Sequence, residues 1–418
     1  MEINFFSKTY INLIKNFLSL SILNVVNLIT PLITLPYLIS VMGVENYGKY
    51  AFTYSIIIYI LLIVNFGFNF SATQDVSVNR NDKIYLSKVF SEVLCIRILL
   101  AVFSISIVLL VTLTTSRFEE IGLLLLNGLG IVLGTILTPS FLFQGVEKMQ
   151  FVTIGAVIPK LVMICTIFFV INGGDDLSLL MNIQSLGFII SGVVSSFIAH
   201  KTIGVRILKI ELEGVIDRLK GSRSLFFSTL GMSLYRESGT IIIGVFLNYE
   251  IVGFYSAAEK IVRVIQGILN PVAQSLFPYI AHRFSEENNV KVKVAILLRI
   301  IKNYALVLFC FVLLIITVLP SIIIYFTDDK YLLSILDIKL LSPLVFFGCL
   351  SYVVGIVGLV NLGYEKYFVK GVFMAGTLAI ILAVIGVNLF DDKGVAIAIS
   401  VSETFLFFYL FKKLYSLK

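Results

Sequence analysis

Long apolar segments separated by short charged hinges run along almost the whole chain. Most exceed the roughly 20 apolar residues that a helix needs to cross a bilayer, and they lack the polar–apolar alternation of barrel strands. A helix also satisfies its own backbone hydrogen bonds in lipid. We therefore predict an all-α integral membrane protein with about twelve spans, at 17–42, 47–72, 84–114, 120–143, 150–172, 178–200, 224–248, 251–280, 295–327, 336–362, 367–390 and 394–414.

Short motifs recur at about half the length of the chain. The tetrapeptide Gly145–Lys148 (GVEK) returns as Gly363–Lys366 (GYEK), and Tyr47–Phe52 (YGKYAF) is echoed by Val252–Ala257 (VGFYSA). These offsets predict two homologous halves of six helices each, in parallel orientation. Parallel repeats around a central cavity are typical of transporters that work by alternating access.

A polar stretch joins the predicted halves. Within it Leu208, Leu212, Val215 and Leu219 recur at helical spacing with charged residues between them, as in an amphipathic helix that lies on a membrane surface. We therefore predict three segments: an N-terminal six-helix bundle over 1–200, a cytoplasmic amphipathic linker over 201–223, and a C-terminal six-helix bundle over 224–418.

Composition and charge agree with this topology. Hydrophobic residues make up 58% of the chain and charged residues 14%, which is far too apolar for a soluble domain. Most lysines and arginines fall at the termini and in the hinges after even-numbered spans, and this bias predicts that both termini are cytoplasmic. The net charge of +7 is thus explained by anchoring at the inner face, and we expect no nucleic-acid partner.

Cysteine and histidine offer no sign of catalysis. The four cysteines lie singly inside apolar runs, and the two histidines fall at predicted helix ends. Cysteines in that setting are usually packing residues, and neither residue type shows the spacing of metal ligands. We therefore expect no metal, no cofactor and no catalytic residues.

The eighth predicted span carries the strongest polar pattern. Glu259, Arg263, Gln266, Asn270 and Gln274 recur every three or four residues, so they form one stripe along about 22 Å of helix. Polar groups at membrane depth are costly and usually face protein or a water-filled cavity. The stripe favours the lining of a lumen, and polar contact between helices is the alternative.

Other predicted spans hold isolated polar residues. Lys260 flanks the stripe, and the polar residues of other spans are Asn24, Asn27, Arg97, Lys160, Arg236, Glu237 and Glu403. For the charged residues in these other spans, a buried ion pair or snorkelling toward the interface is as good an explanation as a lumen.

Three segments resemble a known family. Leu35–Phe52 (LPYLISVMGVENYGKYAF), Phe141–Phe151 (FLFQGVEKMQF) and Val252–Ile261 (VGFYSAAEKI) are similar to the polysaccharide transporter family. These proteins are O-antigen-type flippases of the multidrug/oligosaccharidyl-lipid/polysaccharide exporter superfamily. The resemblance covers essentially the whole chain in order and hydropathy.

The resemblance implies a flippase of the bacterial cytoplasmic membrane, which moves undecaprenyl-pyrophosphate-linked oligosaccharide repeat units, of O-antigen or capsule type, from the inner to the outer leaflet. Partners would be that substrate and membrane lipid, with a glycan polymerase or chain-length complex left open, and we expect a monomer.

Candidate residues follow from charge and polarity. The pyrophosphate would need cations, while amides would bind sugar hydroxyls and carboxylates would couple an ion gradient. The cations are Arg97, Lys160, Arg236, Lys260 and Arg263; the amides are Gln266, Asn270, Asn24 and Asn27; the carboxylates are Glu237, Glu259 and Glu403.

Other functions are less well supported. Many multidrug exporters of the superfamily, which are cation-coupled antiporters, use an acidic residue in the first span, where this chain has Asn24 and Asn27. Lipid II flippases are longer, with fourteen spans. A membrane glycan polymerase or acyltransferase would need a large outer loop or a clustered catalytic group, and the predicted hinges are too short for one. For a scaffold in a glycan-assembly complex the sequence offers nothing positive.

Overall fold

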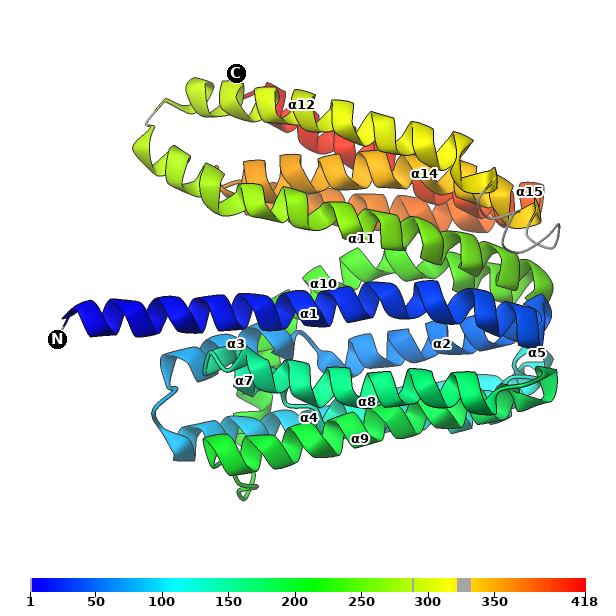
Figure 1. Ribbon diagram of the computed structural model, residues 1–418, viewed down its shortest axis with the longest axis horizontal. Helices are drawn as coiled ribbons and strands as arrows, with labels where there is room; N and C mark the ends of the chain where they lie inside the picture. Colours follow the sequence, from blue (N-terminus) through cyan, green and yellow to red (C-terminus); the bar gives the residue numbers. More distant parts are fainter. Residues whose placement is uncertain (1, 288, 322–331) are drawn as a thin grey trace. The chain divides into compact units, whose positions relative to one another are not determined.

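The computed structural model describes residues 2–287, 289–321 and 332–418, and nearly all of them are helical. The helices are drawn in Figure 1. Their bounds are α1 Glu2–Met42, α2 Val44–Asn65, α3 Phe68–Val78, α4 Lys83–Thr114, α5 Ser116–Glu119, α6 Gly122–Leu137, α7 Ser140–Gly145, α8 Met149–Val170, α9 Leu177–Ile203, α10 Leu212–Phe246, α11 Tyr249–Glu286, α12 Val290–Thr317, α14 Leu332–Tyr352 and α15 Glu365–Tyr415. A short 3₁₀ helix, Gly174–Asp176, precedes α9, and π-helical turns over Val353–Val360 follow α14.

Nine segments within the described ranges are long and apolar enough to cross a membrane, which confirms a multi-span, all-α membrane protein. One of them, α15, contains non-helical residues at Phe390 and Asp391, close to where we separated the last two spans. The segments of α10 and α11 fall short of the same apolar criterion, and these helices carry the polar stripe and Arg236. The number of twelve therefore stays a prediction.

The helices form two compact units. Unit 1 comprises the chain up to Gly43 and Thr53–Leu230, and unit 2 comprises Val44–Phe52 and Gly231–Lys418. Helices α2 and α10 each run from one unit into the other. These boundaries differ from the predicted bundles, because the first nine residues of α2 belong to unit 2 and the predicted linker belongs to unit 1. That the units are homologous six-helix repeats remains a prediction.

The predicted linker is not a separate helix. Helix α9 ends with left-handed Gly204 (φ 84°), and α10 begins at Leu212 and continues unbroken to Phe246. Between them the chain runs along α4, where the backbone N–H groups of Arg206 and Leu208 donate to Ser87 and Ser91 at 3.1 and 2.8 Å. These side-chain acceptors replace the helical carbonyls, which explains why helix formation is delayed to Leu212.

Two predicted spans are interrupted toward their C-terminal ends, at positions that lie in unit 1. The span at 47–72 divides into α2 and α3 at Phe66 and Gly67, which are both left-handed with φ values of 42° and 77°. The span at 120–143 divides into α6 and α7 at Thr138 and Pro139. Because proline has no N–H to continue the helix, the carbonyls at the end of α6 are left for other donors.

Close helix packing in unit 1 depends on small residues. Helix α9 packs against both α6 and α8, and α8 packs against α1; α1, α8 and α9 run lengthwise in Figure 1. A Cβ atom at Gly134 of α6 would overlap the backbone of Phe188, and one at Gly192 of α9 would overlap the Gly134 carbonyl. In lipid, where apolar burial gives little drive for association, such small residues let helix backbones approach and gain dispersion contacts.

Gly134→Ala is therefore expected to destabilise the protein by about 1–3 kcal/mol, the usual cost of overpacking. The measurement is thermal unfolding of the purified protein in detergent. The matched control is Gly173→Ala, because Gly173 has an extended backbone (φ −161°) and no atom within 4 Å of an added Cβ. Equal melting temperatures for the two variants would contradict close α6–α9 packing.

The echoed motifs meet inside unit 2. A Cβ at Gly48 would overlap the Tyr249 carbonyl, and a Cβ at Gly253 would overlap the Val44 carbonyl, so the start of α2 crosses the start of α11 at backbone distance. Helix α14 then packs against α11, α12 and α15. The motifs YGKYAF and VGFYSA thus form a packing contact that holds α11, the helix with the polar stripe.

Candidate functional site

Arg97 on α4 fills the gaps left by the two helix breaks of unit 1. Its side chain is 2% exposed, and it donates from Nη1 to the Thr138 carbonyl at 3.1 Å and from Nη2 to Asn65 Oδ1 at 3.0 Å. Longer contacts reach Asn69 Oδ1 and the Thr135 carbonyl. A cation is favoured there because helix C-terminal carbonyls carry partial negative charge. We therefore interpret Arg97 as a positioning residue that holds both broken helices.

A second cation of unit 1 pairs with an amide of the first span. Lys160 Nζ on α8 donates to Asn27 Oδ1 on α1 at 2.7 Å. Lys160 is half-buried, while Asn27 and Asn24 are exposed on α1. The structure thus brings together two predicted residues from different spans, and leaves Asn24 one turn away on the same helix.

The polar stripe of unit 2 is the densest cluster of predicted residues. Arg263 Nη2 donates to Glu259 Oε1 at 3.3 Å and to the Arg236 carbonyl at 3.0 Å. The other carboxylate oxygen of Glu259 accepts from the Thr240 hydroxyl at 3.1 Å. The side chains of Arg263 and Glu259 are 17% and 11% exposed. Burial strengthens this i, i+4 pair relative to one in water, and α10 thereby contributes a hydroxyl and a carbonyl to it.

About one turn further along α11 lies Gln266, and a glycine of the neighbouring helix α14 leaves room there for two polar side chains. A Cβ at Gly348 of α14 would overlap Gln266 Nε2 and lie 3.5 Å from Glu403 Oε1, so Gln266 and the buried Glu403 both face this position. Gln266 Nε2 also points to the Leu344 carbonyl at 3.5 Å. Asn270 lies beyond, with Cys349 Sγ 3.8 Å from its Oδ1. The stripe thus continues between α11, α14 and α15.

The remaining predicted residues of unit 2 are placed differently. Lys260 lies over the rings of Tyr47 and Tyr50, 5.3 and 5.4 Å from their centroids, which are cation–π distances. It therefore supports the packing of α2 against α11. The side chain of Arg236 is exposed and that of Glu237 is half-buried, so Arg236 joins the cluster through its carbonyl.

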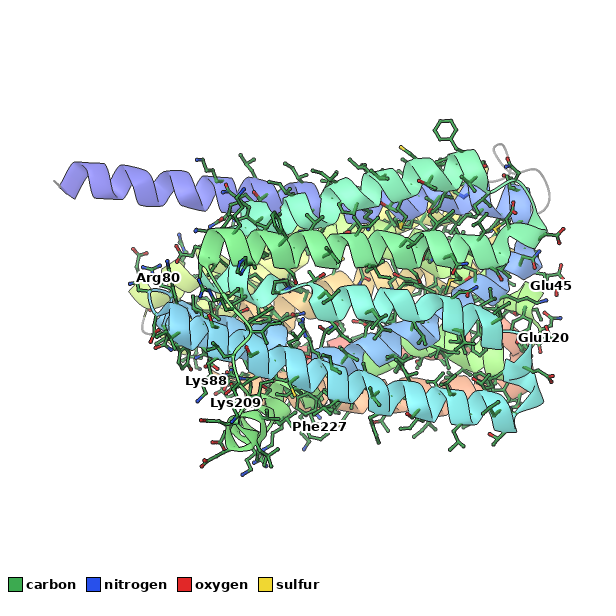
Figure 2. The ribbon with its side chains drawn as sticks, turned by 90° about the horizontal axis from the view of Figure 1, so that it is seen from below. Glu45, Arg80, Lys88, Glu120, Lys209 and Phe227 are labelled. Atoms are coloured by element: carbon green, nitrogen blue, oxygen red, sulfur yellow. The ribbon has the colours of Figure 1, made fainter. Side chains whose placement is uncertain are left out.

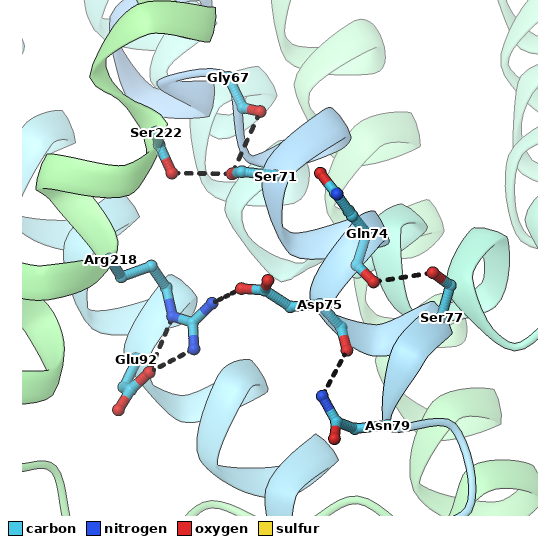
Figure 3. Close-up of polar contacts among 9 residues, drawn as sticks. All are labelled: Gly67, Ser71, Gln74, Asp75, Ser77, Asn79, Glu92, Arg218 and Ser222. Atoms are coloured by element: carbon cyan, nitrogen blue, oxygen red, sulfur yellow. Dashed lines mark hydrogen bonds and ion pairs between the residues drawn. The ribbon is translucent and has the colours of Figure 1, made fainter.

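The structure adds an ion-pair cluster in unit 1 that the charge pattern did not reveal (Figure 3). Arg218 of α10 binds Glu92 of α4 through Nε and Nη2 at 2.8 and 2.7 Å, and Asp75 of α3 through Nη1 at 2.8 Å. Burial by itself lowers the pKa of Arg218, but Glu92 and Asp75 outweigh it and hold the pKa above its usual value. The Ser71 and Ser222 hydroxyls lie 2.7 Å apart beside it.

A buried carboxylate in unit 2 was also overlooked. Asp337 on α14 and Asp392 on α15 are both buried, and Asp392 accepts from Lys393 at 2.8 Å. The signal was available in the sequence, because Asp337 lies at the start of a predicted span, where a carboxylate is costly without a partner.

The sites can bind and orient anions and hydroxyl groups. Unit 2 offers Arg263, its partner Glu259 and the amides of Gln266 and Asn270 on one face of α11, while unit 1 offers Lys160 with Asn27. No group of three or more His, Cys, Asp or Glu in the described residues could hold a metal ion. These clusters suit recognition of a charged, hydroxyl-rich molecule.

Comparison with known proteins finds one matching family model and named relatives. The model of a family described as "Polysaccharide biosynthesis protein" matches residues 13–284. A protein of Escherichia coli (strain K12) named "Putative O-antigen transporter" is 27% identical over 393 residues, 94% of each chain. One of the same name from Shigella dysenteriae is 26% identical over 280 residues, 67% of this chain and 70% of the relative.

Solved structures show the same fold. An inward-facing multidrug resistance MATE family transporter of the MOP superfamily matches with a TM-score of 0.71 at 18% identity, covering 93% of this chain and 95% of its own. The lipid II flippase MurJ in an inward closed conformation matches with a TM-score of 0.69 at 16% identity, covering 96% of this chain and 87% of its own. The predicted exporter-superfamily fold is therefore confirmed.

Proposed function

The chain belongs to the polysaccharide biosynthesis protein family, and on this premise we propose that it is a flippase for lipid-linked oligosaccharides. Its substrate would be an undecaprenyl-pyrophosphate-linked repeat unit, carried from the inner to the outer leaflet of the bacterial cytoplasmic membrane. Both termini would be cytoplasmic, as the distribution of lysine and arginine indicates. The E. coli relative, which matches over 94% of both chains and is named for O-antigen transport, supports this choice of substrate class.

The observation that carries the proposal is the cluster around Arg263, whose side chain is mostly but not fully buried. An oligosaccharide attached through pyrophosphate presents a compact anion beside many hydroxyl groups. Arg263 matches the anion because a guanidinium binds phosphate oxygens in a fixed fork, while Gln266 and Asn270, further along the same helix, match the hydroxyl groups. Within unit 1, Lys160 with Asn27 is a separate candidate pair for an anion and a hydroxyl group. The lipid tail would remain in the bilayer throughout.

Glu259 gives this cluster a route to ion coupling. While it is ionised, Glu259 accepts from Arg263 at 3.3 Å and competes with any substrate anion for the guanidinium. Uptake of a proton by Glu259 would remove the competing charge, so that Arg263 binds pyrophosphate more tightly. Loss of the proton would favour release. Glu403 and Glu237 are the other candidate carboxylates for such a cycle between two states of alternating access.

Export in a deletion strain tests the proposal. Without the gene, cells should accumulate lipid-linked repeat units on the cytoplasmic side, and expression of this protein should restore surface glycan. The measurement is labelling of the repeat unit from outside intact cells, with immunoblotting to verify membrane abundance. The proposal fails if labelling stays absent at normal abundance. Drug resistance without glycan export would indicate a multidrug-type antiporter instead, and glycan turnover by purified protein would indicate an enzyme.

A further inference from the structure

A cavity of about 580 Å³ lies among helix ends in unit 1, away from the clusters described above. Asn81 and Lys83 border it at the start of α4, Lys148 at the start of α8 and Ile203 at the end of α9. Its volume falls in the range of small-molecule sites, roughly 300–1,000 Å³. In Figure 2, Arg80 lies at the same end of the unit as Lys88 and Lys209, opposite Glu120. The charge pattern assigns this end to the cytoplasm.

Positive charge dominates the lining. Lys15, Arg80, Lys83 and Lys148 border the cavity, and Glu147 is the one carboxylate among its described lining residues. Glu147 Oε1 pairs with Arg80 Nη1 at 3.3 Å, but their side chains are 60% and 54% exposed, so water competes strongly for both partners. The cavity therefore keeps an excess of cations, which raises the local concentration of anions.

Backbone contacts fix the wall of this cavity. Asn16 of α1 donates to the Glu147 carbonyl at 3.0 Å and accepts from the Met149 N–H at 3.1 Å. Lys148 Nζ reaches the Thr202 carbonyl of α9 at 3.4 Å. These contacts join α1, the α7–α8 turn and α9 around one space. A wall that is ordered in advance reduces the entropy lost when a ligand binds.

The α7–α8 turn has an unusual residue at its left-handed position. Glu147 (φ 58°) adopts it, with the Lys148 N–H donating to the Phe143 carbonyl at 2.8 Å. In the repeated motif of unit 2 the left-handed residue is the first one, Gly363 (φ 84°), with Tyr364 donating to the Leu359 carbonyl at 2.8 Å, whereas Glu147 is the third residue of its motif. Glycine is the residue that this helix-ending turn prefers. The left-handed residue of the motif in unit 1 is therefore a strained glutamate beside the cavity, whereas that of the motif in unit 2 is a glycine without a side chain.

The turn of unit 2 that carries GYEK contacts a lysine through its aromatic rings. Lys413 lies over Tyr364 and Tyr367, 4.4 and 5.8 Å from their centroids, so its cation already has a partner. The repeated tetrapeptide therefore belongs to a cationic cavity in unit 1 and to an aromatic–cation contact in unit 2.

We propose that the unit 1 cavity binds a phosphate-bearing anion. The source would be either the headgroup of an acidic phospholipid in the neighbouring leaflet or a free phosphate such as pyrophosphate. Leu86, Val146 and Ile203 are the apolar residues of the described lining. Basic cavities among helix ends at the cytoplasmic face are suited to lipid phosphates. The proposal does not rest on the transport of oligosaccharides.

Thermal unfolding of the full-length protein in nanodiscs tests this site. The arms are phosphatidylcholine alone, phosphatidylcholine mixed with phosphatidylglycerol, and phosphatidylcholine with added inorganic pyrophosphate. The cavity variant is Arg80→Gln/Lys148→Gln. The matched control, Lys201→Gln/Lys209→Gln, removes the same charge from exposed side chains that do not line the cavity.

We expect an anion to raise the melting temperature of the wild type and the control by roughly 3 °C, and to leave the cavity variant unchanged. An increase with phosphatidylglycerol identifies a lipid headgroup, and an increase with pyrophosphate identifies a free phosphate. The variant Lys83→Gln should lose part of the increase in melting temperature, and it replaces the double variant in the test if the double variant does not fold. The proposal is overturned if neither anion stabilises the wild type, or if the cavity variant responds as the control does.

Discussion

Replacing Arg218 by methionine should lower the free energy of unfolding by about 3–5 kcal/mol, the cost of removing one partner of a buried ion pair. The Glu92 side chain is only 3% exposed, so the substitution leaves a carboxylate in a dry environment without its cation. The Asp75 side chain is 44% exposed, and water can replace Arg218 there at a cost of about 0–1 kcal/mol. The contact with Glu92 should therefore account for most of the loss.

The loss should appear as a lower melting temperature in detergent and a smaller folded fraction after purification. Lys220→Met is the matched control, because Lys220 is exposed on the same helix, and its effect should stay within about 0.5 kcal/mol. The double variant Arg218→Met/Glu92→Met should regain much of the stability, since no charge is then left buried. A double variant as unstable as the single one would rule out the ion pair as the cause.

Arg263→Gln should reduce export of the lipid-linked repeat unit by roughly tenfold to a hundredfold at normal membrane abundance. A hydrogen bond to a charged group contributes about 1.5–3 kcal/mol, and each 1.4 kcal/mol corresponds to a factor of about ten in binding. Glutamine keeps hydrogen-bonding capacity at this position but removes the charge, so the loss should reflect the missing cation. The measurement is outside labelling of the repeat unit at early times after induction.

Lys260→Gln provides a comparison on the same helix. Lys260 lies over Tyr47 and Tyr50, so its replacement should lower the melting temperature while export per folded molecule stays close to wild type. The two variants thus separate recognition from packing. Equal export by Arg263→Gln and the wild type would remove Arg263 from the site. A larger export defect in Lys260→Gln than in Arg263→Gln would assign recognition to Lys260.

The sequence predicted the parts of the fold that follow from local pattern. Lipid as the solvent requires long apolar helices, so the spans could be located from apolar runs, and the stripe from Glu259 to Gln274 follows from helical periodicity alone. Periodicity could not show that α2 divides between the units, since no local signal at Phe52 or Thr53 marks the change. It also could not show that α10 begins at Leu212, because Ser87 and Ser91, which hold the preceding segment, are more than 100 residues away.

In the candidate site, too, some features were predictable from the sequence and others depend on how the helices pack. The i, i+4 spacing of Glu259 and Arg263 is a property of one helix and was readable in the sequence, whereas the position of Glu403 beside Gln266 depends on how α15 and α11 pack around Gly348. The contact partners of Arg97 and Lys260 could not be predicted either, since an isolated charge in an apolar run does not reveal its partner. Arg97 binds carbonyls freed by helix breaks, and Lys260 contacts tyrosines of α2.

By itself, therefore, the sequence determined that this protein is a multi-span helical membrane protein with the exporter-superfamily fold and a polar stripe on one helix. Only the tertiary structure decided which polar residues recognise one another and which hold the helices together. The physical reason is that helical spacing relates residues three or four positions apart, whereas contacts between helices depend on rotation and close approach, which residues such as Gly48, Gly134 and Gly348 permit.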